Sequence, residues 1–387
     1  MAGSGKLLLE LFLMFVGGKL LAEVAERLRQ PSVVGELLAG VLLGPSLLGL
    51  VHPSELTQGL AEIGAIFLLF SVGLEIKPRD LLQVGWTATG VATLGVLIPF
   101  ALGFFYMEMI GHGPVESIFV GAAMVATSVG ITARVLADAG MLSSHVARVI
   151  LAAAVLDDIL GMIVLAVVSS ISSGRINYVS LAVVSVEAMV FSLLIVFFGS
   201  RVVGRFHLNV AKLRTRNSAF ILSIILCLGL SLASIYIGMA AIIGAFLAGL
   251  ALAEHGESWH LRENVHPLVE FLTPFFFVLL GTQMNLKTAA QPRVLVMASV
   301  ICLLAVLSKL IGCGLGSLGL GWKDSLRVGI GMVPRGEVGL IVAAVGLGLQ
   351  TISNVIYSVI LLMTIFTTLI APPVLRLTLR QSARKAG

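Results

Sequence analysis

Val155-Leu156-Asp157-Asp158-Ile159-Leu160-Gly161 places two adjacent aspartates in the middle of an apolar run that extends from Val146 to Ser170. The run is long enough to cross a bilayer as one helix, which needs about 20 residues. Asp157 lies about nine residues beyond Arg148, or roughly 13 Å at 1.5 Å per residue, so both carboxyl groups fall near the bilayer centre. Ionisable groups at that depth are costly to bury and mark functional sites.

The whole chain has the composition of a membrane protein. Of its 387 residues, 58% are hydrophobic and 12% are charged, and the mean hydropathy is +1.06, whereas soluble domains carry about 25% charged residues. No polar stretch is long enough for a separate soluble domain, so residues 1–387 are predicted to form a single transmembrane unit. The net charge of +5 comes from basic loops and indicates no nucleic-acid partner. The sequence has no GxxxxGK[ST] loop, so we expect no nucleotide partner and no cofactor.

Hydropathy predicts an all-α membrane protein with thirteen transmembrane helices embedded in the lipid bilayer. The expected segments are 7–28, 31–50, 58–75, 84–110, 117–140, 145–172, 179–206, 218–238, 240–254, 265–287, 292–319, 324–350 and 354–379. Most Lys and Arg residues outside these segments follow odd-numbered segments, and basic loops remain in the cytoplasm. The N-terminus is therefore expected outside and the C-terminus in the cytoplasm.

The sequence also repeats itself. Val34–Gly40 resembles Ile243–Gly249, and Thr127–Ile131 aligns with Gly336–Leu340, both at an offset of 209 residues. Segments one to six are thus predicted to recur as segments eight to thirteen, with segment seven as a linker helix at 179–206. Seven segments separate the start of one copy from the start of the next, so the second copy is inverted, as in many secondary transporters.

Segments five and twelve, which occupy corresponding positions in the two repeats, are predicted to be broken helices that cross. Segment five contains Thr127 and Ser128 beside Gly130, and segment twelve contains Pro334 and Gly336. Proline removes a backbone donor and glycine tolerates an unwound path. Paired breaks in inverted repeats indicate a transporter's binding site, because freed carbonyls and hydroxyls can coordinate a desolvated cation. An ordinary proline kink is the alternative for segment twelve taken alone.

Lys309 lies midway along segment eleven and is the expected partner of Asp157. Adjacent residues on a helix point about 100° apart, so Asp157 can pair with the lysine while Asp158 faces a cavity. A purely structural ion pair would leave Asp158 unexplained. A carboxylate that takes either a proton or a monovalent cation exchanges one for the other, which indicates proton-coupled antiport.

Three further charges, Arg134, Arg335 and Glu337, are expected to be structural charges near the crossing of the broken helices. They have the signs to pair with one another there. Glu36 and Glu187, the other clearly intramembrane acids, have no partner that the sequence identifies.

These motifs resemble NapA-type bacterial sodium/proton antiporters of the cation:proton antiporter superfamily. The resemblance covers nearly the whole chain and is carried by VLDDILG at 155–161, ATSVGITARVL at 126–136, PRGEVGLI at 334–341 and the stretch 30–50. It implies a homodimer in the bacterial inner membrane that serves pH homeostasis. It further implies a dimer domain at 7–75 and 218–287, and a core at 84–172 and 292–379 that moves by an elevator-like mechanism.

Residue by residue, the resemblance implies that Asp158 is the main carrier of cation and proton, and that Asp157 forms a pH-sensitive salt bridge with Lys309. Thr127 and Ser128 lie beside them, and the transported Na⁺ or Li⁺ would bind Asp158, Asp157 and Thr127. Two carboxylates and a lysine allow two protons per cation, and hence electrogenic exchange.

Other functions are compatible with part of the pattern. Potassium/proton antiport, or sodium-coupled symport of an organic anion on the same general fold, are the alternatives, although a symporter does not need the Asp157–Lys309 pair. An intramembrane aspartyl protease needs two acids that share a proton across a peptide bond, which adjacent residues of one helix cannot provide. We therefore expect a transporter and not an enzyme; a structural membrane scaffold is the remaining alternative.

Overall fold

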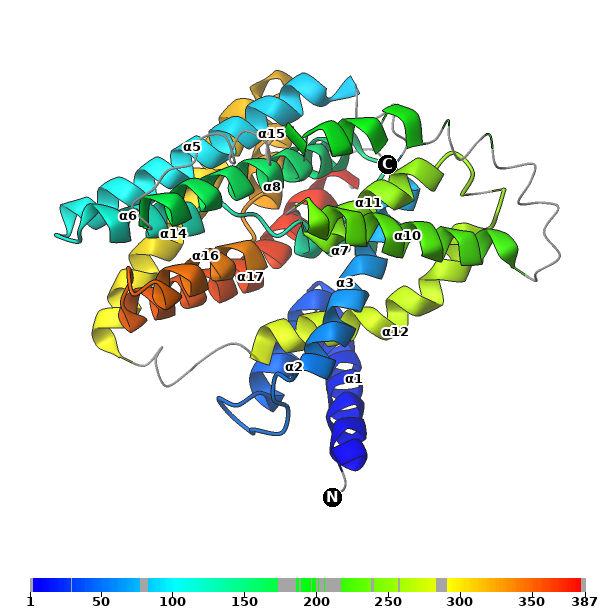
Figure 1. Cartoon of the computed structure of the whole chain (residues 1–387), viewed down its shortest axis with the longest axis horizontal. Coiled ribbons are helices and arrows are strands. Elements are labelled where there is room, and N and C mark those ends of the chain that lie inside the picture. The colour runs from blue at the N-terminus through cyan, green and yellow to red at the C-terminus, as the bar shows by residue number, and fades with distance from the viewer. Residues whose placement is uncertain are drawn as a thin grey trace.

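The computed structural model describes residues 3–28, 30–76, 83–172, 217–237, 240–256, 258–282 and 291–383, with scattered positions between 186 and 205. Every regular element in these ranges is a helix (Figure 1). The first half contains α1 (Gly3–Arg27), α2 (Ser32–Leu43), α3 (Glu55–Glu75), α5 (Gly85–Met109), α6 (Pro114–Ala123), α7 (Val129–Asp138) and α8 (His145–Ser172). The second half contains α10 (Ser218–Tyr236), α11 (Ala241–Leu252), α12 (Leu261–Thr282), α14 (Pro292–Gly316), a short 3₁₀ turn (Leu318–Leu320), α15 (Trp322–Gly331), α16 (Glu337–Gly348) and α17 (Asn354–Ala383).

Six of the described helices are long and apolar enough to cross a bilayer, so the chain is a multi-pass membrane protein. They lie in α3, α5, α10, α12, α14 and α17, and shorter apolar helices include α2, α6 and α11. The predicted linker helix at 179–206 lies largely outside the described residues.

Predicted segments five and twelve are each interrupted where the sequence places the break. Segment five consists of α6 and α7, which are separated by residues 124–128, and segment twelve consists of α15 and α16, separated by residues 332–336. One predicted boundary differs. The segment expected at 31–50 is helical only to Leu43, because Pro45 disfavours a helical conformation at Gly44.

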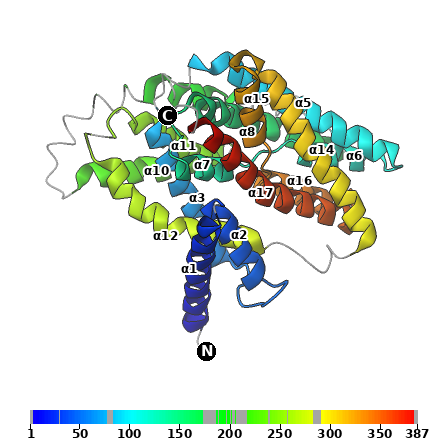
Figure 2. The ribbon, with the colours of Figure 1, turned by 180° about the vertical axis from the view of Figure 1, so that it is seen from behind.

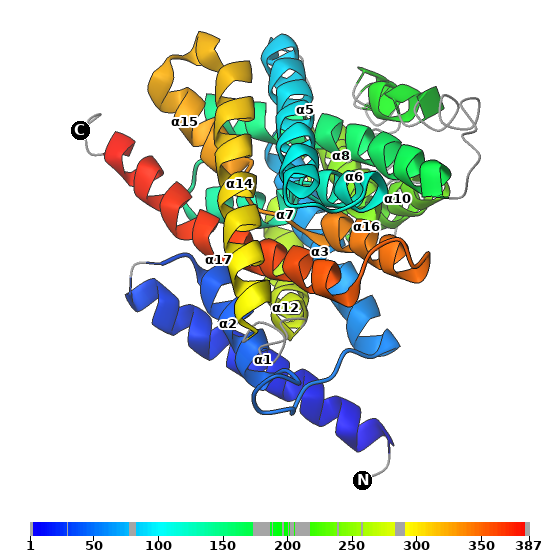
Figure 3. The ribbon, with the colours of Figure 1, turned by 90° about the vertical axis from the view of Figure 1, so that its left-hand side faces the viewer.

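The described helices pack as two sets. The scaffold set comprises α1, α2, α3, α10, α11 and α12, and the crossing set comprises α5, α6, α7, α8, α14, α15, α16 and α17. Within the crossing set, α16 and α17 lie side by side in Figure 2, and α5 runs alongside α14 in Figure 3. The two sets touch mainly where α7 meets α2 and α3 and where α17 meets α2.

Glycine pairs bring the scaffold helices into backbone contact. A Cβ atom on Gly40 of α2 would overlap the Val278 carbonyl oxygen of α12 and lie 2.8 Å from Gly281 Cα. The same contact recurs between α11 and α3, where Gly249 faces Phe70 and Gly73. Helices that cross at glycine can approach until their backbones touch, as small residues permit in membranes.

Replacing Gly40 with alanine should therefore destabilise the scaffold set. Overpacking costs about 1–3 kcal/mol, and the atoms that must move at this crossing are backbone atoms with no rotamer to change. We expect a lower midpoint of thermal unfolding for the purified Gly40→Ala protein. Gly229→Ala on α10 is the control, since a Cβ there has nothing within 4 Å. Equal midpoints for the two variants would contradict the close crossing.

Candidate functional site

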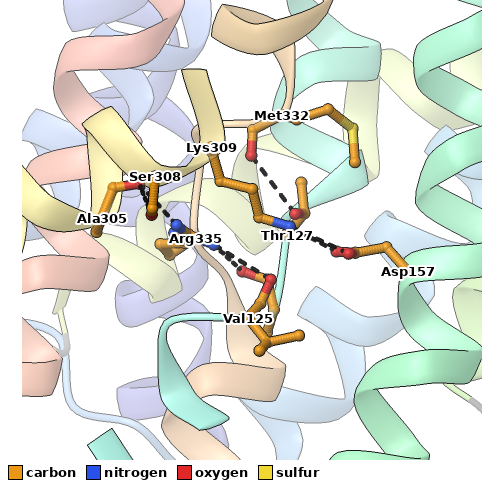
Figure 4. Close-up of polar contacts among 9 residues, drawn as sticks. Val125, Thr127, Asp157, Ala305, Ser308, Lys309, Met332 and Arg335 are labelled. Atoms are coloured by element: carbon orange, nitrogen blue, oxygen red, sulfur yellow. Dashed lines mark hydrogen bonds and ion pairs between the residues drawn. The ribbon is translucent and has the colours of Figure 1, made fainter. Parts of the chain in front are cut away.

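A buried ion pair joins α8 to α14. The Lys309 Nζ atom lies 3.0 Å from Asp157 Oδ1 and 3.3 Å from Oδ2, and the two side chains are 0% and 1% exposed. Figure 4 shows the two side chains pointing toward each other. The pair predicted from the sequence is thus in contact and excluded from solvent. Buried charges require such partners because each is costly to desolvate alone.

A glycine on α5 packs against α14 beside the lysine, where it makes room for Cys313. A Cβ atom on Gly95 would lie 2.7 Å from Cys313 Sγ and 3.5 Å from Lys309 Nζ. On α14, Gly312 packs directly against the backbone of Leu94. Gly95 is one of 42 glycines, and nothing in the sequence distinguishes it, because the sequence does not show which helix faces Lys309.

The two broken helices are tied to each other at their interruptions. The Ser128 amide donates to the Pro334 carbonyl at 2.8 Å, and Thr127 Oγ1 donates to the Met332 carbonyl at 3.4 Å. A Cβ atom on Gly336 would lie 2.8 Å from Ser128 Cβ, so glycine is required for this close approach. Backbone groups freed by one break are therefore satisfied by the other, as a membrane interior demands.

Arg335 occupies the crossing itself. Its side chain is fully buried, and its guanidinium donates to the carbonyls of Val125 and Ala126, each at 3.2 Å, and of Ala305 at 2.8 Å (Figure 4). The first two carbonyls follow the end of α6, where the helix dipole favours a cation. Glu337 begins α16, but its side chain lies outside the described residues.

Asp158 lies on a different face of α8 from Asp157 and lines a cavity of about 390 Å³, a volume that includes the space at its mouth. The crossing set contributes Thr127, Ser128, Val129, Gly130, Asp158 and Gly336 to the lining, and the scaffold set contributes Ala65, Leu69, Ala240, Ile242 and Phe276. One carboxylate and two hydroxyl-bearing residues therefore face one space. Oxygen ligands of this kind suit hard cations. Among the described residues, no group of three or more His, Cys, Asp or Glu side chains is arranged to hold a resident metal.

Arg134, which was expected near the crossing, belongs to a second polar cluster between the two helix sets. Its Nε atom is 3.1 Å from Asp138 Oδ1 on the same helix, α7, and its Nη2 atom is 3.7 Å from Glu270 Oε1 on α12. On the scaffold side, Ser32 Oγ donates to Asp138 Oδ2 at 2.7 Å, and Lys19 Nζ donates to Glu270 Oε2 at 2.7 Å. The cluster therefore holds α7 against α2 and α12.

Glu36 on α2 faces the same cluster. Its side chain is 1% exposed, and it lies within electrostatic reach of Arg134 and Lys19. The sequence identified no partner for Glu36 because these charges come from helices far apart along the chain.

The chain is similar in sequence to known cation transporters. Residues 11–381 match the family model described as "Sodium/hydrogen exchanger, transmembrane". The chain is 36% identical to the high-affinity Na⁺/H⁺ antiporter NhaS3 of Synechocystis, over 95% of this chain and 89% of that protein. It is 33% identical to the Na⁺/H⁺-K⁺ antiporter GerN of Bacillus cereus, over 98% of both chains.

The solved structure of the sodium proton antiporter MjNhaP1 from Methanocaldococcus jannaschii shares the fold. The TM-score is 0.65 at 20% identity, over 97% of this chain and 96% of that one. As the sequence motifs predicted, the chain belongs to the sodium/hydrogen exchanger family, a family of secondary transporters and not of enzymes, within the cation:proton antiporter superfamily.

Proposed function

We propose that this chain exchanges sodium or lithium ions for protons across the bacterial inner membrane and so serves pH homeostasis. The observation that carries the proposal is the position of Asp158, whose carboxyl group lines a cavity shared with Thr127 and Ser128 and lies next to the buried Asp157–Lys309 pair. The curated relatives named above, which are described as Na⁺/H⁺ antiporters, support the same activity.

The exchange rests on competition at one carboxyl group. Asp158 binds either a proton or a cation, since each of them neutralises its charge. A core that crosses readily only when this charge is neutralised carries a cation one way and a proton the other. Thr127 supplies a hydroxyl to the bound cation.

The Asp157–Lys309 pair adds a second proton to the cycle. When the cation reaches Asp157 as well as Asp158, it replaces the ammonium group as the counter-charge of Asp157. A buried lysine that has lost its counter-charge releases its proton. Two protons then leave for each monovalent cation, and the exchange moves net charge.

Alternating access is proposed to occur by an elevator-like movement of the crossing set, the core, against the scaffold set, the dimer domain of a homodimer. Both sets line the Asp158 cavity, so sliding one past the other would change the side from which the carboxyl group is reached. The Arg134 cluster spans the same boundary. The matched crossings at Gly40 and Gly249, which are 209 residues apart, support the inverted repeat that such movement uses. The N-terminus is proposed to lie outside and the C-terminus in the cytoplasm.

Potassium is the second candidate cation. The relative from Bacillus cereus, which this chain matches over nearly its whole length, is described as a Na⁺/H⁺-K⁺ antiporter. Sodium and potassium ions carry the same charge, so the carboxyl and hydroxyl groups that line the Asp158 cavity do not distinguish them by charge.

Asp158→Asn should abolish exchange, because an amide neither ionises nor releases a proton. The assay is a pH-sensitive dye inside proteoliposomes, read after addition of Na⁺, Li⁺ or K⁺ to the wild type and the variant. Asp324→Asn, which alters a carboxylate at the start of α15 outside the cavity, is the control and should retain exchange. A wild type that moves no protons with any of the three cations rules out the antiporter function.

Lys309→Gln should remove net charge movement while some exchange remains. Glutamine keeps a donor toward Asp157 but has no proton to release. We expect a valinomycin-imposed membrane potential to accelerate sodium uptake by the wild type and to have no effect on the variant. Lys323→Gln replaces an exposed lysine and should behave as the wild type. Equal potential dependence in all three proteins would exclude Lys309 from the charge-moving step.

Cross-linking across the boundary between the two sets tests the elevator movement. In a background without Cys227, Cys302 and Cys313, a thiol cross-link in a Ser32→Cys/Asp138→Cys protein joins α2 to α7. We expect it to stop exchange, and reduction to restore it, because the sets can no longer slide. A longer cross-link in Lys19→Cys/Glu270→Cys joins two scaffold helices and should leave exchange as it was before cross-linking. Full exchange by a completely cross-linked Ser32/Asp138 pair would contradict relative movement.

A further inference from the structure

The interruption between α15 and α16 leaves backbone groups that cannot bond within a helix. Pro334 has no amide hydrogen to satisfy, and its carbonyl accepts from Ser128. Arg335 is the next residue and retains both a donor and an acceptor. A backbone group without a hydrogen-bond partner inside a membrane protein costs several kcal/mol. The partners of the Arg335 amide and carbonyl therefore determine whether the interruption keeps one backbone conformation.

Two neighbouring threonines of α17 bind both backbone groups of Arg335. The Arg335 amide donates to Thr367 Oγ1 at 3.3 Å, and Thr368 Oγ1 donates to the Arg335 carbonyl at 2.8 Å. The side chains of Thr367 and Thr368 are 0% and 2% exposed. The Thr367 hydroxyl also lies 2.8 Å from the Met363 carbonyl, so its proton goes to its own helix while its oxygen accepts from Arg335.

The Arg335 side chain links its restrained backbone to the cation site. Its guanidinium holds the carbonyl of Ala126, which directly precedes Thr127, and the carbonyl of Ala305, one helical turn before Lys309. A displacement of Arg335 would therefore move a hydroxyl of the cation cavity and the lysine of the buried pair together.

The position of Thr367 in the repeat gives an independent observation. Thr367 lies 209 residues after Asp158, the same offset that relates Thr127–Ile131 to Gly336–Leu340. The second repeat thus carries a hydroxyl where the first carries the carboxyl group of the cavity. A threonine hydroxyl does not ionise near neutral pH, so this position can fix backbone but cannot exchange a proton for a cation.

We infer that Thr367 and Thr368 are positioning residues that set the geometry of the cation site through Arg335. The inference rests on the proposed antiport at Asp158 and adds to it a residue pair on α17 that governs cation affinity without touching the cation. Equivalent positions of the two repeats thus have different roles. Asp158 on α8 binds the ion, and Thr367 on α17 fixes the backbone beside the cation site.

Thr367→Val tests this inference because valine has the shape of threonine without the hydroxyl. We expect the apparent KM for Na⁺ in proteoliposomes to rise about tenfold, the effect of losing one buried hydrogen bond, while the maximal rate stays within about twofold. Thr367→Ser restores the hydroxyl and should return the KM to the wild-type value. Thr368→Val, which removes the donor to the Arg335 carbonyl, should raise the KM in the same direction and provides the test if Thr367→Val does not fold.

The matched control lies one turn earlier on the same helix. Thr364 is 1% exposed, and its hydroxyl donates to the Ile360 carbonyl within α17. Thr364→Val therefore removes a buried hydroxyl that does not bind the break, and the KM should be unchanged.

Cation binding measured without transport separates the two proposals. Sodium that binds the folded protein raises its midpoint of unfolding, and the sodium concentration for half of this shift should be about tenfold higher for Thr367→Val than for wild type. If the wild type exchanges sodium for protons but the KM is unchanged in Thr367→Val and in Thr368→Val, the positioning role is overturned. The antiport proposal is then unaffected. An equal rise in Thr364→Val overturns it as well. A wild type that exchanges no cation defeats the proposed function itself.

Discussion

A polypeptide inside a bilayer must satisfy its own backbone hydrogen bonds, and the centre of this protein is arranged around two places where the helices fail to do so. The interruptions at 124–128 and 332–336 meet, and each supplies partners to the other: the Ser128 amide binds the Pro334 carbonyl, and Thr127 binds the Met332 carbonyl. The unwound segments are consequently held in one geometry. Thr127 and Ser128, at the end of the first interruption, line the same cavity as Asp158.

Charge adds a second constraint at the same place. Lys309 and Arg335 are two cations with no measurable exposure, and Asp157 provides the direct counter-charge of the lysine at 3.0 Å. Arg335 is instead surrounded by carbonyl oxygens. A guanidinium keeps its positive charge under ordinary conditions and has only donors. Arg335 therefore holds three carbonyls at the crossing as a permanent cation, whereas the proposed exchange assigns a transported proton to Lys309.

The fold class, both interruptions and the Asp157–Lys309 pair could be predicted because each has a local signature in the sequence. These signatures are long apolar runs, Pro334 with Gly336, and a lysine in the middle of an apolar segment. The sequence predicts Arg134 near the crossing with Arg335 and Glu337 as its companions, whereas the ion-pair partners of Arg134 in the structure are Asp138 and Glu270. The separation of Thr127 and Arg134 along the chain was visible in the sequence, but the neighbours of Arg134 on α12 and α2 were not. Gly95 and Thr368 were missed for the same reason, since their importance depends on which atoms of another helix face them. Thr367 is different: the offset of 209 residues from Asp158 is a signal that the sequence does contain.

The glycine crossings of the scaffold have a thermodynamic consequence. Contacts between long side chains stabilise a bundle only after the side chains have lost rotamer freedom, which costs up to about 2 kcal/mol for the most flexible ones. At Gly40 with Gly281, and at Gly249 with Gly73, the touching atoms belong to the main chain, so no side-chain entropy is lost when they meet. Such junctions have no alternative packing to which they can relax. At these two crossings the packing contact therefore forms without a loss of side-chain rotamer freedom.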